Sequence, residues 1–228
     1  MSSETARLTR EHLESLPTYR PGRRPEQISQ ELGISEAVKL SANELPFGPL
    51  PGVVEAVTRA ATQVHRYPDM FVGELREELA KRHGVDVEEL VTGCGSVALC
   101  EHLTVATAAP RDEVIFGWRS FEAYPILVAR IDAAPVRVPN TPDHRIDIDG
   151  ILDSVTAATR LIFLCSPNNP TGSLIGREEL QRLLAGVPDN VVVALDEAYR
   201  DFVTDPHAPD SLSLRVDHPN LVVLRSFS

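Results

Sequence analysis

The segment LIFLCSPNNPTG, residues 161–172, is a run of apolar side chains that ends abruptly in prolines, asparagines and a glycine. A helical pattern, REELQRLLAG, follows at 177–186, and a second apolar run, VVVAL, occupies 191–195. This order predicts a βαβ unit, whose crossover is right-handed in nearly all proteins and whose strands are therefore parallel. The residues that follow the two strands should consequently lie side by side at one edge of a sheet.

Outward from this unit, the chain from about residue 89 onward alternates short apolar strands with amphipathic helices, which is typical of an α/β domain. Further strands are predicted at 90–92, 114–117, 135–139 and 221–224, and helices at 96–108, 121–131 and 149–157. Upstream of residue 89, prolines at 17, 21 and 25 favour an extended arm with a short helix at 28–33. Helical patterns follow at 53–67 and 71–84, and Gly84 is expected to end the second of them.

The composition favours an enzyme that acts on small molecules. The 228 residues carry a net charge of −11, whereas nucleic-acid and anionic-membrane surfaces need clustered Lys and Arg. The three cysteines form no CxxC pair, so neither a zinc site nor a disulfide framework is predicted. The sequence shows neither a signal peptide nor an apolar run of membrane-spanning length. We therefore expect a reduced, cytoplasmic and unprocessed protein.

Polar side chains follow the apolar runs at the predicted sheet edge. Asn168 and Asn169 come after the first run, and Asp196 directly follows VVVAL. In open α/β sheets, ligands bind outside the carboxyl ends of the strands. A carboxylate after five apolar residues is expected to be partly buried and to need a compensating partner. Arg200 and Arg225 could provide it, and so could a ligand that carries a protonated nitrogen.

A glycine turn, Gly93-Cys94-Gly95, precedes the helix that is expected to open at Ser96. Free N–H groups and the helix dipole make such a helix start suitable for a phosphate. The same letters match the dinucleotide fingerprint GxGxxA, but the acidic residue that a Rossmann domain needs after the next strand is missing. A simple tight turn capped by Ser96 is the alternative.

Aromatic side chains make up only 5% of the sequence, yet Trp118, Phe121 and Tyr124 cluster after the strand at 114–117. One of them could stack on a planar ring, or all could pack beneath the loop. Tyr199 lies three residues after Asp196 and could reach the same crevice.

These motifs together resemble the fold-type I pyridoxal phosphate-dependent aminotransferases. SPNNPTG at 166–172, followed by DEAY at 196–199, is specific because two separated motifs coincide. The resemblance lies in the histidinol-phosphate aminotransferase branch, and WRSFEAYP at 118–125 is most similar to its bacterial aromatic amino acid aminotransferases. It implies an α/β fold with a mostly parallel, seven-stranded-type sheet flanked by helices. Residues 1–45 would form an N-terminal arm with part of a small domain, and residues 46–228 would form the large cofactor-binding domain.

The resemblance also assigns residues to the cofactor, pyridoxal 5'-phosphate. Backbone N–H groups of Ser96 and Val97 would hold its phosphate, with the Ser226 hydroxyl and with Tyr67 from a second subunit of a homodimer. Phe121 would stack on the cofactor ring, and Asn169 and Tyr199 would donate hydrogen bonds to its phenolic oxygen. Asp196 would keep the ring nitrogen protonated. Asp196 and Tyr199 would thus be the catalytic residues of this chain.

For the substrate, the resemblance implies an exchange of an amino group between an aromatic L-amino acid and 2-oxoglutarate. Tyr19 and Asn43 would line the substrate pocket, and Leu45, where the family often has Asn, favours a less polar substrate. Histidinol phosphate is the alternative substrate. The Schiff-base lysine is expected directly after Ser228, with the substrate-binding arginines and the small C-terminal domain beyond it. A non-catalytic module of the same fold, without that lysine, is the alternative from another class.

Overall fold

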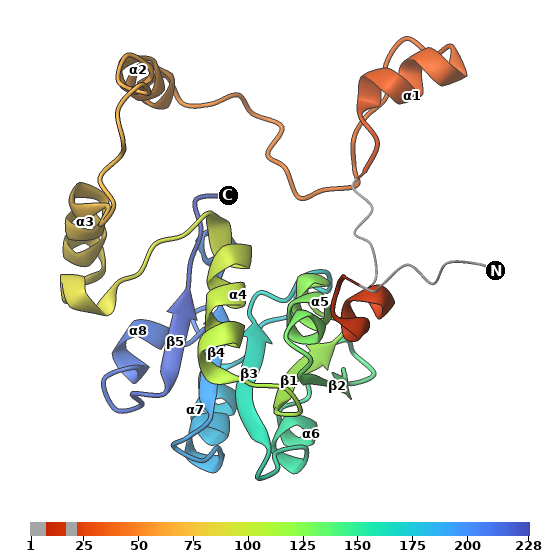
Figure 1. Ribbon diagram of the computed structural model, residues 1–228, viewed down its shortest axis with the longest axis vertical. Helices are drawn as coiled ribbons and strands as arrows, with labels where there is room; N and C mark the ends of the chain where they lie inside the picture. The colour runs from red at the N-terminus through yellow and green to blue at the C-terminus, as the bar shows by residue number, and fades with distance from the viewer. Residues whose placement is uncertain (1–7, 17–21) are drawn as a thin grey trace. The chain divides into compact units, whose positions relative to one another are not determined.

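A computed structural model describes residues 8–16 and 22–228 (Figure 1). The chain divides into two compact units, the first made of residues 1–16 and 76–228 and the second of residues 17–75. None of the helices in the described ranges combines the length and apolar character that crossing a membrane requires. The predicted division at residue 45 derives from the family resemblance and stays a prediction.

The first unit is built on a five-stranded sheet with the order β2-β1-β3-β4-β5, in which all neighbours are parallel. The strands are β1 (Glu113–Trp118), β2 (Ala134–Pro139), β3 (Thr159–Cys165), β4 (Val192–Asp196) and β5 (Leu221–Leu224). The predicted α/β class and the βαβ unit around residues 161–195 are confirmed. The described residues supply five strands of the seven-stranded type of sheet that the resemblance implies.

The strand order reverses between β1 and β3. From β1 the chain first adds β2 on one side and then returns to add β3, β4 and β5 on the other. Such a switch point leaves a crevice at the carboxyl ends of the two central strands, where ligands of open α/β sheets bind. The loops that follow β1 and β3 therefore border the expected site.

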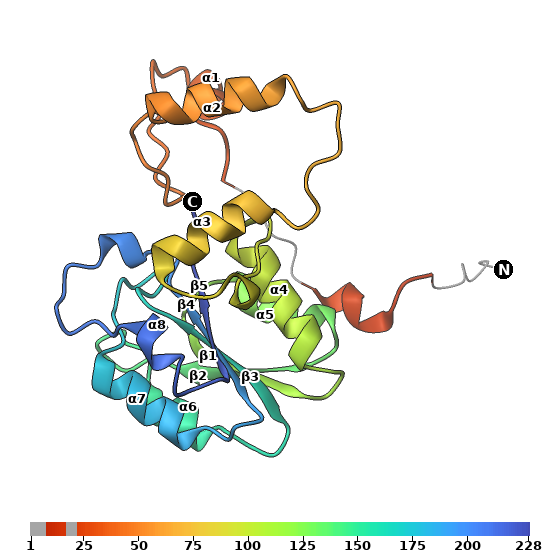
Figure 2. The same cartoon turned by 90° about the vertical axis from the view of Figure 1, so that its left-hand side faces the viewer.

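Helices cover both faces of the sheet, as Figures 1 and 2 show. One face packs against α6 (Ile148–Asp153) and α7 (Arg177–Gly186), and the other against α4 (Gly95–Thr107) and α5 (Ala123–Arg130). Alternate strand residues face opposite layers, so Ile162 and Leu164 lie in the first core and Phe163 in the second. Burial on both faces explains why these strands are continuous apolar runs.

The described residues form further helices. They are the helix α8 (Ser211–Leu214) and the short 3-10 helices η1 (Glu11–Ser15), η2 (Val87–Glu89) and η3 (Arg200–Phe202), together with α1 (Pro25–Leu32), α2 (Pro51–Ala61) and α3 (Gly73–His83). Gly84 follows α3 with φ of 65°, a left-handed conformation that ends a helix readily. The helical pattern at 53–67 is realised only as far as Ala61.

The strand predicted at 90–92 is wrong. Leu90 has extended dihedral angles, with φ of −110° and ψ of 133°. No strand in the described part of the chain pairs with these residues, and a strand is defined by its ladder of hydrogen bonds. An apolar triplet predicts extended backbone, but its pairing depends on a distant neighbour.

The second unit has no buried residue among its described positions, 22–75. Its helix α2 is amphipathic, yet Val53, Val54 and Val57 on its apolar side are 50%, 48% and 63% exposed. A helix of this length is marginal in water without a packed apolar face. The segment therefore has an apolar surface that its own residues do not cover.

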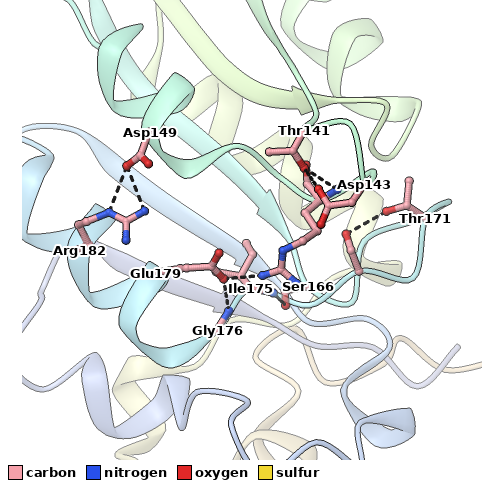
Figure 3. Close-up of polar contacts among 11 residues, drawn as sticks. Thr141, Asp143, Asp149, Ser166, Thr171, Ile175, Gly176, Glu179 and Arg182 are labelled. Atoms are coloured by element: carbon pink, nitrogen blue, oxygen red, sulfur yellow. Dashed lines mark hydrogen bonds and ion pairs between the residues drawn. The ribbon is translucent and has the colours of Figure 1, made fainter.

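A local hydrogen-bond network fixes the start of α7 behind the loop that follows β3 (Figure 3). Glu179 accepts a hydrogen bond from the Gly176 N–H (2.6 Å) and forms an ion pair with Arg145 (2.8 Å). Ser166 accepts a hydrogen bond from the Ile175 N–H (3.0 Å). These contacts satisfy backbone donors that a helix start leaves without partners, so they fix where the loop after β3 ends.

We expect Glu179→Ala to lower the free energy of unfolding by about 1–2 kcal/mol, because the substitution removes the hydrogen bond to Gly176. Glu179→Gln keeps an acceptor for that N–H and loses only the half-exposed ion pair with Arg145, which should cost less than about 1 kcal/mol. Urea denaturation of the two variants checks this. Equal losses in both would assign the effect to the ion pair instead.

Candidate functional site

The site centres on Asp196, the last residue of β4. In the sheet register it lies between Cys165 of β3 and Leu224 of β5, and its exposed fraction is 2%. The strand alternation places Asp196 on the side of Ala194, which belongs to the core beneath α4 and α5. The sequence therefore puts an acidic side chain into a largely apolar layer.

Two protein donors contact the Asp196 carboxylate. The Tyr124 hydroxyl donates to Oδ2 (2.9 Å), and the Ala198 N–H donates to Oδ1 (3.1 Å). Burial raises the pKa of Asp196, the two hydrogen bonds lower it, and the nearby charge of Glu197 raises it. Burial is the largest of these effects, because removing a carboxylate from water disfavours its charged form.

The hypothesis that Arg200 or Arg225 compensates Asp196 is wrong for Arg225, and no described Arg or Lys forms an ion pair with Asp196. Arg225 instead donates to Glu197 through Nε (3.1 Å) and Nη2 (2.9 Å). Arg225 therefore pairs with the residue that follows Asp196 and not with Asp196 itself. The residues that the structure describes thus leave Asp196 without a cationic partner.

Arg225 also contacts a histidine. Its Nη1 lies 3.3 Å from Nδ1 of His83 at the end of α3, and because a guanidinium has only donors, His83 must be the acceptor. Burial lowers the pKa of His83, and the charges of Arg225 and Arg82 lower it further, against an opposite effect of Asp201. A neutral imidazole is the form that can accept this bond.

The sequence named Tyr124 only as one of three clustered aromatic residues and gave no sign of its contact with Asp196. Tyr124 lies in α5, is fully buried, and stacks on Phe163 with a centroid distance of 4.6 Å and an interplanar angle of 2°. Phe121, predicted as the ring-stacking residue, is half-buried and meets Tyr124 edge-on at 5.5 Å. The sequence signal for this contact is the spacing of Phe121 and Tyr124. Residues three apart lie on the same side of a helical turn.

The SPNNPTG loop separates the roles of its two asparagines. Asn168 is 2% exposed and bonds to the Ser120 hydroxyl (2.7 Å), the Thr171 hydroxyl (2.8 Å) and the Arg119 carbonyl (3.1 Å). The Asn168 side chain thus holds the loop in place. Asn169 is half-buried, and its backbone N–H donates to Sγ of Cys165 (3.4 Å), so the loop is fixed to the end of β3.

The glycine turn leads into α4 as predicted, but the helix begins at Gly95 and is preceded by Cys94. Ser96 therefore lies inside the first turn, and no side chain caps this end. The N–H groups of Ser96 and Val97 have no partner within the helix, because the first turn lacks preceding carbonyls. Gly95 adopts φ of 76°, which glycine reaches without strain. The helix start is thus suited to an anion.

The other predicted residues are placed as follows. Tyr199 is half-buried and directly precedes η3, three residues beyond Asp196. The Ser226 hydroxyl follows β5 and accepts a hydrogen bond from the Ser228 N–H (2.9 Å). Tyr67 and Asn43 belong to the second unit and are exposed, and Tyr19 lies outside the described residues. The described residues contain no cluster of three or more metal-ligating side chains.

The chain is similar to several known proteins. The family model "Aminotransferase class I and II" matches residues 35–228. An aromatic amino acid aminotransferase of Streptomyces avermitilis is 48% identical over 226 residues, which cover 99% of this chain and 62% of that protein. Another, from Cutibacterium acnes, is 53% identical over 192 residues, which cover 84% of this chain and 54% of that protein. The chain therefore spans less than two thirds of the length of these relatives.

Among solved structures, the chain is similar to a histidinol-phosphate aminotransferase from Sinorhizobium meliloti in complex with pyridoxal-5'-phosphate. The TM-score is 0.86 at 29% identity, and the match covers 99% of this chain and 60% of that one. An aspartate aminotransferase variant from Thermus thermophilus gives a TM-score of 0.73 at 28% identity, and the match covers 82% of this chain and 54% of that one. The fold predicted from the motifs is thus found in these structures.

We expect Arg225→Met to destabilise the protein by about 3–5 kcal/mol, because it leaves the buried Glu197 carboxylate without its partner. Adding Glu197→Gln to this variant should recover part of the loss. The matched control is Arg182→Met, whose partner Asp149 is largely exposed and which should cost less than about 1 kcal/mol. Chemical denaturation measures all three, and equal effects of the two arginine substitutions would contradict the importance of burial.

Proposed function

Because the chain belongs to the class I and II aminotransferase family, we propose that it contributes the cofactor-binding part of a pyridoxal phosphate-dependent aminotransferase for aromatic L-amino acids, with 2-oxoglutarate as the amino acceptor. The relatives that support the substrate class are 48% and 53% identical and are named aromatic amino acid aminotransferases. The three cysteines are free thiols, which suits a reducing compartment such as the cytoplasm.

The observation that carries this proposal is the buried Asp196 carboxylate without a cationic partner. An ionised carboxylate at 2% exposure is costly unless a charge or several donors compensate it, and among the described residues two donors contact it. A protonated pyridine nitrogen would supply the missing positive charge. The residues present therefore fit pyridoxal phosphate, which, when bound, withdraws electrons from the carbon at which the substrate loses its proton.

The surrounding elements support one orientation of the ring. The first-turn N–H groups of Ser96 and Val97 would bind the phosphate, together with Ser226. Phe121, two residues before α5, would stack on the ring, and its edge-on contact with Tyr124 fixes its position. Asn169 and Tyr199 would donate to the phenolic oxygen, opposite the nitrogen that Asp196 binds. Neutral donors there stabilise negative charge on that oxygen without bringing in a counter-charge.

The second unit supports a homodimer with shared active sites. Tyr67 is fully exposed, and none of the described residues from 22 to 75 is buried. An apolar surface of this kind marks an interaction site in soluble proteins. We assign Tyr67 to the phosphate of the partner subunit's cofactor, and Tyr19 and Asn43 to the substrate pocket.

Asp196→Asn should lower the transamination rate at least about a hundredfold, because the neutral amide cannot stabilise the protonated ring nitrogen. The measurement is kcat for L-phenylalanine with 2-oxoglutarate, using the full-length protein saturated with pyridoxal phosphate. Asp149→Asn, at a largely exposed site, is the matched control and should leave kcat unchanged. Retention of full activity by Asp196→Asn would contradict the assigned role.

The substrate class is tested with the same protein. We expect kcat/KM for phenylalanine, tyrosine or tryptophan to exceed that for histidinol phosphate by about tenfold or more, since a less polar pocket discriminates against a phosphate group. A preference for histidinol phosphate would favour the alternative activity. Cofactor binding without turnover of any of these substrates would favour a non-catalytic module.

A further inference from the structure

We propose that Tyr124 is a positioning residue, whose phenol keeps the Asp196 carboxylate ionised and turned toward the nitrogen of the cofactor ring. The inference rests on the proposed function, because it concerns the same site. The sequence placed Tyr124 only in a cluster of aromatic residues after β1, and it did not predict a contact with Asp196. It is carried by one contact between two buried side chains that are 72 residues apart in the chain.

The geometry of this contact leaves little freedom. The Tyr124 hydroxyl donates to Oδ2 of Asp196 over 2.9 Å, and both side chains are almost completely buried, at 0% and 2% exposure. The tyrosine ring stacks on Phe163 (4.6 Å, 2°) and contacts Phe116 (6.0 Å, 54°). Because these aromatic contacts fix the ring, the hydroxyl points at one carboxylate oxygen.

Asp196 keeps free acceptor positions that a donor from a ligand could use. An ionised carboxylate has two oxygens that together accept about four hydrogen bonds. Tyr124 occupies one position on Oδ2, and the Ala198 N–H occupies one on Oδ1. With one donor on each oxygen the carboxylate cannot rotate freely, so its free acceptor positions keep a constant direction. A ring nitrogen that donates from that direction would meet a preset partner.

The charges around Asp196 show why a phenol is suited to this task. Glu197, the residue that follows β4, opposes the ionisation of Asp196, and Arg225 forms an ion pair with Glu197. Burial raises the pKa of Cys100 in α4, and raises that of Cys165 in β3 to about 12, so both thiols are neutral. Burial also raises the pKa of Tyr124 well above its ordinary value. Tyr124 therefore stays a protonated donor wherever Asp196 is ionised.

A purely structural role would not require the hydroxyl. Phenylalanine would fill the same space and keep the stacking on Phe163, and the layer around the ring is otherwise apolar. The oxygen of Tyr124 instead meets a carboxylate, and that bond favours the charged form. Tyr124→Phe is thus a substitution that removes one donor and preserves the packing.

The test compares Tyr124→Phe with Thr104→Val in the full-length protein. Thr104 is also buried, but its hydroxyl donates to the Cys100 carbonyl within α4, so this control removes a hydroxyl that does not touch Asp196. Carbon-13 NMR of labelled aspartate gives the carboxyl pKa of Asp196 in the cofactor-free protein. We expect Tyr124→Phe to raise this pKa by about one to two units, because a hydrogen bond to a charged group is lost. Thr104→Val should leave it unchanged.

Kinetics provide a second readout. In the cofactor-loaded protein, Tyr124→Phe should lower kcat about tenfold or more with little change in KM, because the lost bond acts on the ring and not on substrate binding. The acidic limb of the pH profile should move to higher pH, because Asp196 then stays protonated to a higher pH. Both variants should bind pyridoxal phosphate and unfold cooperatively, which excludes general misfolding.

The outcomes separate the two proposals. An unchanged Asp196 pKa and an unchanged pH profile in Tyr124→Phe, with an active wild-type protein, would overturn the role of Tyr124 and leave the proposed function standing. A wild-type protein that neither binds pyridoxal phosphate nor transaminates would overturn the proposed function, and this inference with it. A raised pKa together with a shifted pH profile supports the assignment.

Discussion

A carboxylate held almost without water at the end of β4 is the constraint on which the rest of this site depends. Asp196 is 2% exposed, and burial of that degree opposes ionisation unless donors and an opposite charge compensate it. Tyr124 and Ala198 donate hydrogen bonds to this carboxylate. No Arg or Lys among the described residues forms an ion pair with it. Among the described residues the site thus lacks a positive charge, and the proposed protonated pyridine nitrogen would supply one.

The topology of the sheet brings the loops that follow β1 and β3 close to this carboxylate. Because the strand order reverses between β1 and β3, the segments after these strands border one crevice, and each ends in a rigid arrangement of its own. After β1, Phe121 contacts Tyr124, and after β3, Asn168 fixes the loop that presents Asn169. Rigid supports of this kind hold a cofactor in one orientation, which is the main contribution of the protein to cofactor chemistry.

Two adjacent acids show how one strand can serve structure and chemistry at once. Asp196 and Glu197 are both buried, but they have different partners. Glu197 pairs with Arg225 and fixes the end of β5 against β4, whereas Asp196 receives only neutral donors. Two neighbouring residues thus have different roles. Glu197 forms an ion pair that stabilises the fold, whereas Asp196 is proposed to bind the ligand.

The sequence by itself determined the βαβ unit, the parallel sheet and the position of Asp196 at a strand end, because apolar periodicity and turn residues act over a few neighbouring residues. Only the tertiary structure decided which groups meet there. Tyr124 reaches Asp196 across 72 residues, and Arg225 selects Glu197 rather than Asp196. The apolar triplet at 90–92 forms no strand, although its local pattern predicts one. Pairing and partner choice depend on strand register and on contacts between distant segments, and no local pattern of residues encodes these.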